Sequence, residues 1–583
     1  MKKLTKALAM VFAATMHFSN AACSNVEELD PNTITVTVFN GGGGTEWIQR
    51  VAAEYNKTAT KYKVDLTYEK ITASKIFSGM EQGFPSADCY FTSDAAFQAG
   101  IYRDYYEDLS DLLDRTVDDT GKTIKEKMLH YSDWQKLSSK NGEGMYMLPY
   151  LDAFTGLVYD HDLFVSKGWL QYADASDKAA LTEQGYTFEE VKEGTATRLY
   201  FTSATGKTNY EEGDVLLKAG KDGKFGTYDD GQPKTEAEFK AMITNISGGS
   251  DAAKPFLYNA VHDHYVNQIA QGVMAQYMGE KAYHQAFAFD SGDATIKMHD
   301  GTEKQVDIAT NGYEMYKSEG VYQALKFIDT YFNNDAYIDA NSKKTATFTH
   351  TDAQSRFIME MDKANAGSHT QYPTMLVEGS WWVNEASVII GQVAERNPSR
   401  AKEKVDFRYM LLPQIEGQYG IDGNGNGTFF SGSDNGGIVV VKQEDKAKLA
   451  AIKDFIAMTM ADEVLRDYTV TTGIIRPFDY ALSEAELAKM TPFARNAWEI
   501  YHDTQNVKIE RYAMLYNTQP IVFAGKICDS SYIYMETQGV YNNSYVRALR
   551  SAGGLNNLWA NVGYDAATWA SAVQAAKTQG FYK

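Results

Sequence analysis

From residue 33 to about residue 94, the hydrophobic residues recur with two periods in turn, one typical of strands and one typical of helices. The segment TITVTVF, residues 33–39, alternates and is rich in β-branched side chains, which predicts a strand. Four glycines follow, and then Trp47, Val51 and Tyr55 recur every four residues, which predicts a helix. Two more strands are expected in YKVDLTYEKI and FPSADCYFTSD. This order predicts a parallel sheet covered by helices, an α/β fold.

The rest of the chain contains more apolar elements and one long polar segment. Two apolar strands, residues 145–148 and 155–159, are joined through Pro149, and we place a crossing between lobes there. Residues 171–245 are polar and rich in Gly, Lys, Asp and Thr, which predicts an insertion with little core of its own. Because a chain of 583 residues is too long for one compact core, we expect at least two lobes.

Charge and aromatic content narrow the class of partner. The chain has 56 basic and 76 acidic residues, for a net charge of −20. Nucleic acid is therefore not an expected partner, because phosphate binding needs clustered Lys and Arg. The 39 tyrosines, 28 phenylalanines and 8 tryptophans favour surfaces that contact a wet, partly apolar partner, and sugars are such partners.

The N-terminus has the order of an export signal over residues 1–22. Three lysines precede a ten-residue apolar run, and small residues lead to Cys23. One interpretation is cleavage before Cys23, with lipid on that cysteine and residues 23–32 as a tether. The other is an ordinary cleavage site at Ser19-Asn20-Ala21, since Asn20 stands where lipoprotein signals usually have an aliphatic residue. The position of Cys23 directly behind the apolar run favours lipidation. No later run is long enough to span a bilayer.

Two other cysteines, Cys89 and Cys528, are too few for a disulfide framework. Because Cys89 lies in an apolar strand pattern, we expect a buried free thiol there.

The usual enzyme signatures are missing. Gly41 and Gly43 begin a dinucleotide-like pattern, but Glu46 stands at its third glycine, and there is no G-x-S-x-G, H-E-x-x-H or C-x-x-C. The only dense group of metal-ligand residues is His262-Asp263-His264, which is more simply interpreted as two imidazoles on opposite faces of a helix start. A carboxylate pair for glycoside cleavage stays open, because such a pair is defined by distance in space.

The polar insertion contains GKDGKFGTYDDGQP, a candidate Ca²⁺ loop. Asp222, Thr227, Asp229 and Asp230 bring hard oxygen ligands together, and glycines allow a tight path. The spacing is not that of an EF-hand. An ordinary surface loop bounded by Asp-Gly turns is the alternative.

Several segments together resemble one protein family. They are the export signal with Cys23, VFNGGGGTEWIQRVAAEYNK, SADCYFTSD, YMLPYLDAFTGLVYD, MLVEGSWWVNEA, TGIIRPFDY and the aspartate-rich insertion. In this order they resemble an extracellular solute-binding lipoprotein of a bacterial carbohydrate ABC importer, family 1 type. The resemblance covers the whole mature chain. It implies a two-lobed fold with several hinge crossings and a ligand cleft between the lobes. The N-lobe would comprise residues 33–150 and 432–482, and the C-lobe residues 151–431 with the C-terminal helices, 483–583.

Within that family, the resemblance places cleft-facing aromatics near Trp381 and Trp382. Adjacent residues point in different directions, so we expect one indole to stack on a sugar ring and the other to pack in the lobe, with Trp381 slightly favoured as the platform. The alternative is that both are core. Trp47 is a second candidate platform or a core residue. Three polar residues near the expected cleft, where surface salt bridges are the alternative role, are candidates for sugar hydroxyls: Asp94, Asp152 and Arg476.

The function implied is capture of an extracellular oligosaccharide and its delivery to an ABC import permease. The protein would be a monomer without enzymatic activity, lipid-anchored on the outer face of the cell membrane, requiring no cofactor beyond the candidate structural Ca²⁺. Two alternatives are an exported glycan-active hydrolase that uses a carboxylate pair and a sugar-sensing lipoprotein.

Overall fold

The structure, a computed structural model, describes residues 31–578 with short gaps. The gaps are residues 42, 70–72, 93–102, 119, 139–142, 251, 288–293, 308–309, 366, 368–370, 435, 512–532, 536–539, 543 and 564. The export signal, Cys23 and Cys528 lie outside the described residues.

The first lobe is built on a five-stranded sheet in the order β2-β1-β3-β14-β4. The strands are β1 (Thr33–Phe39), β2 (Lys63–Glu69), β3 (Cys89–Thr92), β14 (Gly437–Val440) and β4 (Leu148–Pro149). β1 pairs in parallel with β2 and β3, as the sequence predicts, whereas β14 pairs antiparallel with β3 and β4. Cys89 is buried in β3 as a free thiol, which confirms the prediction.

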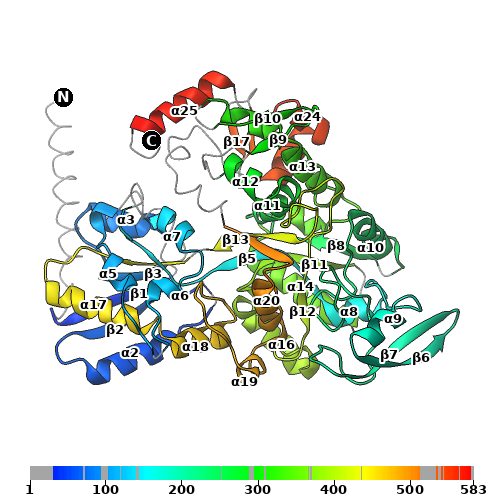
Figure 1. The fold of residues 1–583 in the computed structure, drawn as a ribbon, viewed down its shortest axis with the longest axis horizontal. Helices are drawn as coiled ribbons and strands as arrows, with labels where there is room; N and C mark the ends of the chain where they lie inside the picture. Colours follow the sequence, from blue (N-terminus) through cyan, green and yellow to red (C-terminus); the bar gives the residue numbers. More distant parts are fainter. Residues whose placement is uncertain are drawn as a thin grey trace, which may run out of the picture.

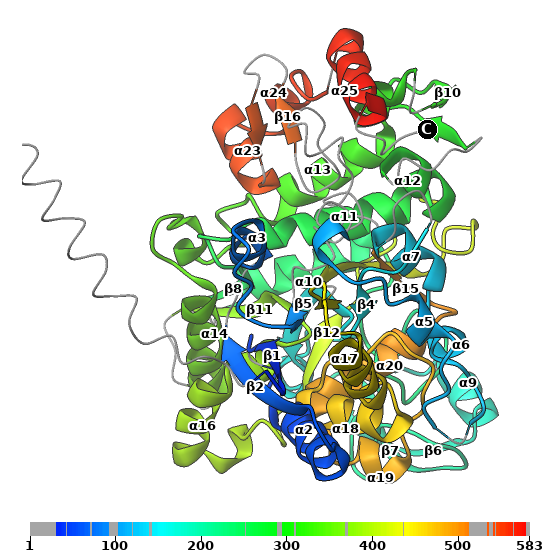
Figure 2. The same ribbon diagram turned by 90° about the vertical axis from the view of Figure 1, so that its left-hand side faces the viewer.

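Helix α2 (Glu46–Thr58) covers this sheet with its predicted apolar stripe. Trp47, Val51 and Tyr55 are all buried, because residues about four apart share one face of a helix. Two helices from much later in the chain, α17 (Lys446–Met458) and α18 (Asp462–Thr472), contact α2. Figure 1 and Figure 2 show these yellow helices beside the blue N-terminal elements. Other N-lobe elements are α3 (Ala73–Glu81), η1 (Arg103–Tyr105), α5 (Ser110–Leu113), α6 (Ile124–Lys127) and α7 (Tyr131–Ser138).

The second lobe is built on a six-stranded mixed sheet. Its path is β15-β13-β5-β11-β8, with β12 also paired to β5. The strands are β5 (Ala153–Asp160), β8 (Ala253–Leu257), β11 (Tyr372–Gly379), β12 (Phe407–Met410), β13 (Thr428–Asp434) and β15 (Val507–Glu510). Every residue of β5 and β11 is buried, as expected for central strands covered on both faces.

Helices cover both faces of the C-lobe sheet. α11 (Tyr265–Met278) contacts β13 and packs on α13 (Glu319–Tyr331), while α14 (His350–Asn365) contacts β11 and α20 (Pro492–His502) contacts β12. The remaining elements are α8 (His161–Ser166), α10 (Glu236–Gly248), α12 (Glu280–Phe287), β9 (Thr295–Lys297), β10 (Glu303–Gln305), η2 (Gly312–Lys317), η3 (Ala340–Lys343), α15 (Trp382–Glu385), α16 (Ser387–Arg396), η4 (Pro398–Arg400), α19 (Glu484–Leu487), β16 (Ile533–Met535), β17 (Val540–Asn542), α23 (Tyr545–Ala552), α24 (Leu555–Trp559) and α25 (Ala566–Thr578).

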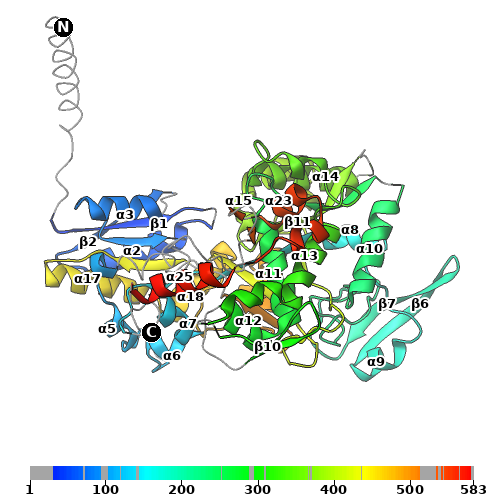
Figure 3. The same ribbon diagram turned by 90° about the horizontal axis from the view of Figure 1, so that it is seen from above.

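The insertion has a small core of its own. It contains α9 (Lys178–Glu183) and a hairpin of β6 (Tyr186–Glu193) and β7 (Ala196–Ala204), which projects from the end of the C-lobe opposite the N-lobe (Figures 1 and 3). A separate apolar cluster supports it: Ala173, Leu181, Tyr186, Leu199, Phe201, Leu216 and Phe225.

Three chain segments join the lobes, and they are hydrogen-bonded side by side. The first lies between β4 and β5, the second between β13 and β14, and the third between α18 and α20. The Tyr150 N–H donates to the Gly436 carbonyl at 2.9 Å, and the Asp152 N–H donates to the Ile475 carbonyl at 2.9 Å. The three segments therefore form one hydrogen-bonded hinge between the lobes.

No helix among the described residues is both long and apolar enough to cross a membrane.

Candidate functional site: the cleft between the lobes

Both lobes line a cavity of about 280 Å³ next to the hinge. The N-lobe contributes Gly41, Gly43 and Gly44 from the turn after β1, together with Trp47 and Tyr468. From the C-lobe come two imidazoles and a tyrosine at the start of α11, His350 at the start of α14, and Trp381 and Glu385 after β11. A ligand in this cavity would contact both lobes at once.

Trp381 follows the end of β11 and forms part of the cavity wall. Its side chain is half-buried, and its ring meets that of Tyr265 edge-on, with the centroids 6.4 Å apart at 87°. The indole lies over Gly379, where an added Cβ would be 2.2 Å from Cη2 of Trp381. Trp381 therefore presents an aromatic surface to the cavity, and the backbone at Gly379 lies directly behind the ring.

Trp382 is fully buried, and the structure places it in the C-lobe core. Its ring packs edge-on against Phe407, Phe357 and Phe493, at centroid distances of 5.0, 5.9 and 5.8 Å. It does not line the cavity. The two adjacent tryptophans thus occupy different environments, because consecutive residues at a helix start point in different directions.

Trp47 contributes to both core and cavity. It is 1% exposed and packs edge-on against Phe91 and Tyr468, yet it forms part of the cavity floor. The helical stripe explains its burial, and its position directly after the glycine turn explains why it reaches the cleft.

Asp152 lies at the hinge, behind the cavity wall, and this position differs from the predicted one. Its carboxylate accepts from Arg511 Nε at 2.9 and 3.0 Å and from the Tyr501 hydroxyl at 2.8 Å. The aspartate is fully buried and Arg511 nearly so. An ion pair this enclosed occupies the carboxylate oxygens that a sugar would need.

Arg476 is also buried and away from the cavity wall. Its Nη1 donates to the Thr459 carbonyl at 2.6 Å, and its guanidinium lies 5.8 Å from the ring centre of Trp47. The arginine therefore supports the aromatic floor from behind instead of contacting a ligand. Asp94, the third predicted polar contact, lies outside the described residues.

Three histidines on the C-lobe wall were not predicted as cleft residues. The ring of His262 lies 5.6 Å from that of His264 and 6.1 Å from that of His350, between centroids. Burial is the main cause that lowers the pKa of His264 to about 4, and it also lowers the pKa of His262. His262 and His264 are therefore neutral near pH 7 and can each donate and accept a hydrogen bond. The sequence pattern showed the first two, but nothing local connects them to His350.

A buried polar network supports the wall behind Trp381. Gln354 Nε2 donates to Glu378 at 3.1 Å and to Glu385 at 2.8 Å, and His350 Nε2 lies 3.5 Å from Glu385. Burial raises the pKa of Glu378 to about 8, and the charge of Glu385 adds to this rise. Among the described residues of the cavity wall, Glu385 is the one carboxylate.

The candidate Ca²⁺ residues lie in the insertion, outside the cleft. Asp229 and Asp230 are buried, and Thr227 Oγ1 donates to both, at 3.0 and 3.3 Å. Asp230 also accepts from the Tyr210 hydroxyl at 2.6 Å, and Asp222 accepts from the Lys224 N–H at 2.8 Å. In the described part of the chain, the metal-type trio with ligand atoms within 4.8 Å of one another lies elsewhere, at Glu280, His284 and Glu510.

Comparison with solved structures identifies the fold. A chitin oligosaccharide binding protein is 14% identical, with a TM-score of 0.50 over 94% of this chain and 98% of that chain. A protein described for xylan utilization by Caldanaerobius polysaccharolyticus is 12% identical, with a TM-score of 0.51. The match covers 94% of this chain and 99% of that chain. The apo form of RafE from Streptococcus pneumoniae is 14% identical, with a TM-score of 0.50. The match covers 91% of this chain and 98% of that chain.

The chain has the fold of these three proteins. The predicted α/β architecture, two lobes around a cleft, is thereby confirmed. No known sequence family matches the chain, and no curated protein sequence matches it. The likeness therefore lies in three-dimensional structure, and the chemistry of the cleft has to be argued from this chain's own residues.

Proposed function

We propose that the protein captures an oligosaccharide in the interlobe cleft and delivers it to an ABC import permease. The observation that carries this proposal is an aromatic cavity whose walls come from both lobes, with Trp381 on one side and Trp47 on the other. Indole faces suit the C–H faces of sugar rings, and neutral imidazoles suit hydroxyls, which also donate and accept. The similar chitin oligosaccharide binding protein is consistent with such a ligand.

Binding without cleavage is favoured over hydrolysis. Glycoside cleavage uses two carboxyl groups, about 5–10 Å apart, that flank the scissile bond. Glu385 is the one carboxylate among the described cavity residues, and the nearby Glu378 is buried behind it. We therefore propose a binding protein that is not an enzyme. The sugar-sensing alternative uses the same cleft and differs only in the partner that recognises the closed form.

A thermal-shift screen of oligosaccharides tests the proposed function. A ligand that binds only the folded state raises the melting temperature by mass action, and indole fluorescence should change on binding. The ligand should be recovered unchanged after prolonged incubation. Release of shorter sugars would establish the hydrolase instead, and a complete lack of stabilisation by any oligosaccharide would contradict a sugar ligand.

We also propose export and attachment to the outer face of the cell membrane through lipid on Cys23, with the protein acting as a monomer. The charged, apolar and small-residue order of residues 1–22 supports this proposal. Fractionation of cells that carry Cys23→Ala tests it. The variant should leave the membrane fraction, and a variant that stays there would show that lipid on Cys23 is not the anchor.

A structural Ca²⁺ in the insertion is the last part of this proposal. Burial raises the pKa of Asp229 to about 6, and the negative charge of Asp222 is the next cause of this rise. None of the three aspartates Asp222, Asp229 and Asp230 forms a salt bridge with a described residue. Buried carboxylates that lie close together repel one another, and a divalent cation between them would offset this repulsion. Asp222, Thr227, Asp229 and Asp230 would supply side-chain oxygens.

A further inference from the structure

Glu385 stands beside Trp381 on the C-lobe wall of the interlobe cavity. Trp381 is the N-cap of α15 and Glu385 is the last residue of that helix, and the Glu385 N–H donates to the Trp381 carbonyl at 3.3 Å. Residues four apart lie on the same face of a helical turn, and both of these side chains line the cavity. A hydrogen-bond acceptor therefore lies next to the aromatic platform.

Two side chains one turn apart on α14 hold the carboxylate of Glu385 in place. Gln354 Nε2 donates to its Oε2 at 2.8 Å, and His350 Nε2 lies 3.5 Å from its Oε1. Gln354 is 1% exposed, whereas the Glu385 side chain remains 14% exposed. A carboxylate has about four acceptor positions, so these two contacts do not exhaust it. Glu385 is therefore fixed by the lobe and still able to accept from a ligand.

The negative charge of this wall lies on Glu385 and not on the neighbouring Glu378. Gln354 Nε2 bridges the two carboxyl groups, because it also donates to Glu378 at 3.1 Å. Burial raises the pKa of Glu378 to about 8, and the charge of Glu385 is the next cause of this rise. Near pH 7 the buried carboxyl is therefore protonated, and the charge of the pair faces the cavity.

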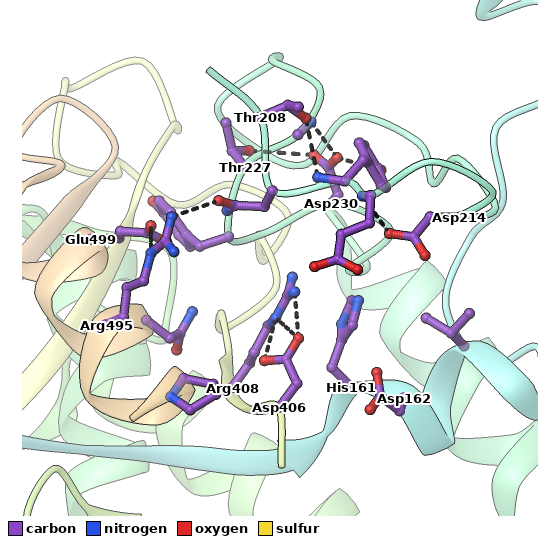
Figure 4. Close-up of a pocket in the computed structure, with 18 of the residues that line it drawn as sticks. His161, Asp162, Thr208, Asp214, Thr227, Asp230, Asp406, Arg408, Arg495 and Glu499 are labelled. Atoms are coloured by element: carbon purple, nitrogen blue, oxygen red, sulfur yellow. Dashed lines mark hydrogen bonds and ion pairs between the residues drawn. The ribbon is translucent and has the colours of Figure 1, made fainter. Parts of the chain in front are cut away.

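The larger cavity of the C-lobe shows what a wall with balanced charge looks like. This cavity, of about 770 Å³, lies between the insertion and the body of the lobe, and two arginines on its wall are paired with carboxylates (Figure 4). Arg408 Nε donates to both oxygens of Asp406 at 3.0 Å, and Arg495 Nε donates to Glu499 at 3.2 Å. The described residues that line the interlobe cavity include neither lysine nor arginine. There, Glu385 sets the sign of the potential that a ligand meets.

We propose that Glu385 selects the sugar in the cleft, by accepting from two neighbouring hydroxyls of the ring that stacks on Trp381 and by excluding rings that carry a carboxylate. Hydrogen bonds from hydroxyls to a carboxylate are charge-assisted, and a ligand carboxylate at the same place meets a like charge. The substrate class is thus neutral oligosaccharides and not those built from uronic acids. This inference rests on the proposed function, because it needs a sugar in the interlobe cleft.

Matched pairs of trisaccharides test the choice between neutral and acidic sugars. Galactotriose is compared with trigalacturonic acid of the same linkage, and mannotriose with trimannuronic acid, by thermal shift and calorimetric titration of the full chain near pH 7. Within each pair, a carboxylate replaces the hydroxymethyl group and the ring stays the same. We expect a neutral member to bind, and its acidic partner to bind at least about tenfold more weakly, because like charges are brought together.

The variant Glu385→Gln tests the residue itself. Glutamine keeps the shape of the side chain and can still accept from Gln354, so the unliganded variant should melt as the parent does. Loss of the charge should weaken binding of the neutral trisaccharide by about tenfold and narrow its preference over the acidic partner. The second effect is one that a merely structural role would not produce. Glu395→Gln is the matched control, because it makes the same change at an exposed position of α16 and should leave both properties unchanged.

The possible failures of this inference and of the proposed function are distinguishable. Neutral binding that is equal in Glu385→Gln and the parent would overturn the role of Glu385, and the cleft would still be a sugar site. An acidic trisaccharide that binds the parent as tightly as its neutral partner would overturn the substrate class in the same way. Failure of every trisaccharide, neutral or acidic, to bind would overturn this inference together with the proposed function.

Discussion

The indole of Trp381 rests on the backbone of Gly379, and no side chain fits between them. A Cβ built on Gly379 would lie 2.2 Å from Cη2 and 2.3 Å from Cζ3 of Trp381. Gly379 is the last residue of β11, a strand buried along its whole length, so the backbone cannot easily move away. The glycine therefore fixes where the aromatic wall of the cleft stands.

The change Gly379→Ala should displace the indole and weaken oligosaccharide binding by about tenfold, with the fold retained. Isothermal titration of the parent and the variant measures this. Gly391→Ala is the matched control, since a Cβ there meets nothing within 4 Å. Binding that is unchanged in both variants would show that the position of Trp381 does not matter to the ligand.

The two adjacent tryptophans should respond differently to truncation. Trp381→Ala removes a cleft-facing ring and should cost about 2 kcal/mol of binding free energy, roughly thirtyfold in affinity, while the lobe stays folded. Trp382→Ala leaves a cavity among Phe357, Phe407 and Phe493 and should cost about 3–5 kcal/mol in the free energy of unfolding. Titration calorimetry and urea denaturation distinguish the two effects. Two stable variants that bind as the parent does would contradict both assignments.

Local periodicity was enough to predict β1 and α2, because each depends on a pattern within about ten residues. The same kind of argument placed Trp381 and Trp382 in different environments and favoured Trp381 only slightly as the platform. What decides it is β11 and its Gly379, together with three phenylalanines from distant parts of the chain.

The polar groups of the site could not be predicted in this way, because their partners are remote in sequence. Asp152 is paired with Arg511, 359 residues later, and that partner turns an expected sugar ligand into a hinge ion pair. His350 joins His262 only because α14 and α11 begin at the same cleft. The residues of the insertion's small core could not be named from the sequence for a related reason, since the seven buried side chains are spread along a polar segment.

The ion pair of Asp152 and Arg511 should be important for stability. Asp152→Asn leaves the buried guanidinium without its counter-charge, which should cost about 3–5 kcal/mol in the free energy of unfolding. Asp467→Asn breaks the exposed pair with Arg50, whose side chains are 40% and 52% exposed, and should cost about 1 kcal/mol or less. Urea denaturation measures both. Equal, small losses would show that the hinge does not depend on this pair.

Removal of divalent cations should destabilise the insertion if it holds Ca²⁺. Addition of chelator should then lower the melting temperature of the parent, and Asp229→Ala should have a lower melting temperature that chelator no longer changes. Asp422→Ala, in the exposed glycine-rich loop before β13, is the control and should keep the response to chelator. A parent melting curve that chelator leaves unchanged would assign residues 222–230 to an ordinary surface loop.

Acid should destabilise the C-lobe partly through His264. Its pKa is lowered to about 4, by burial first and then by His262, whereas an unfolded histidine titrates near 6.5. Between these values the unfolded chain binds a proton that the folded chain does not. The free energy of unfolding therefore falls as the pH falls from about 6.5 to about 4, by at most about 3 kcal/mol from this group, and the group has no effect above that window. His264→Gln removes the titration, so the parent should lose stability relative to the variant across the window. Urea denaturation at several pH values measures this difference, and a constant difference from pH 8 to pH 4 would show that His264 is not held neutral by burial.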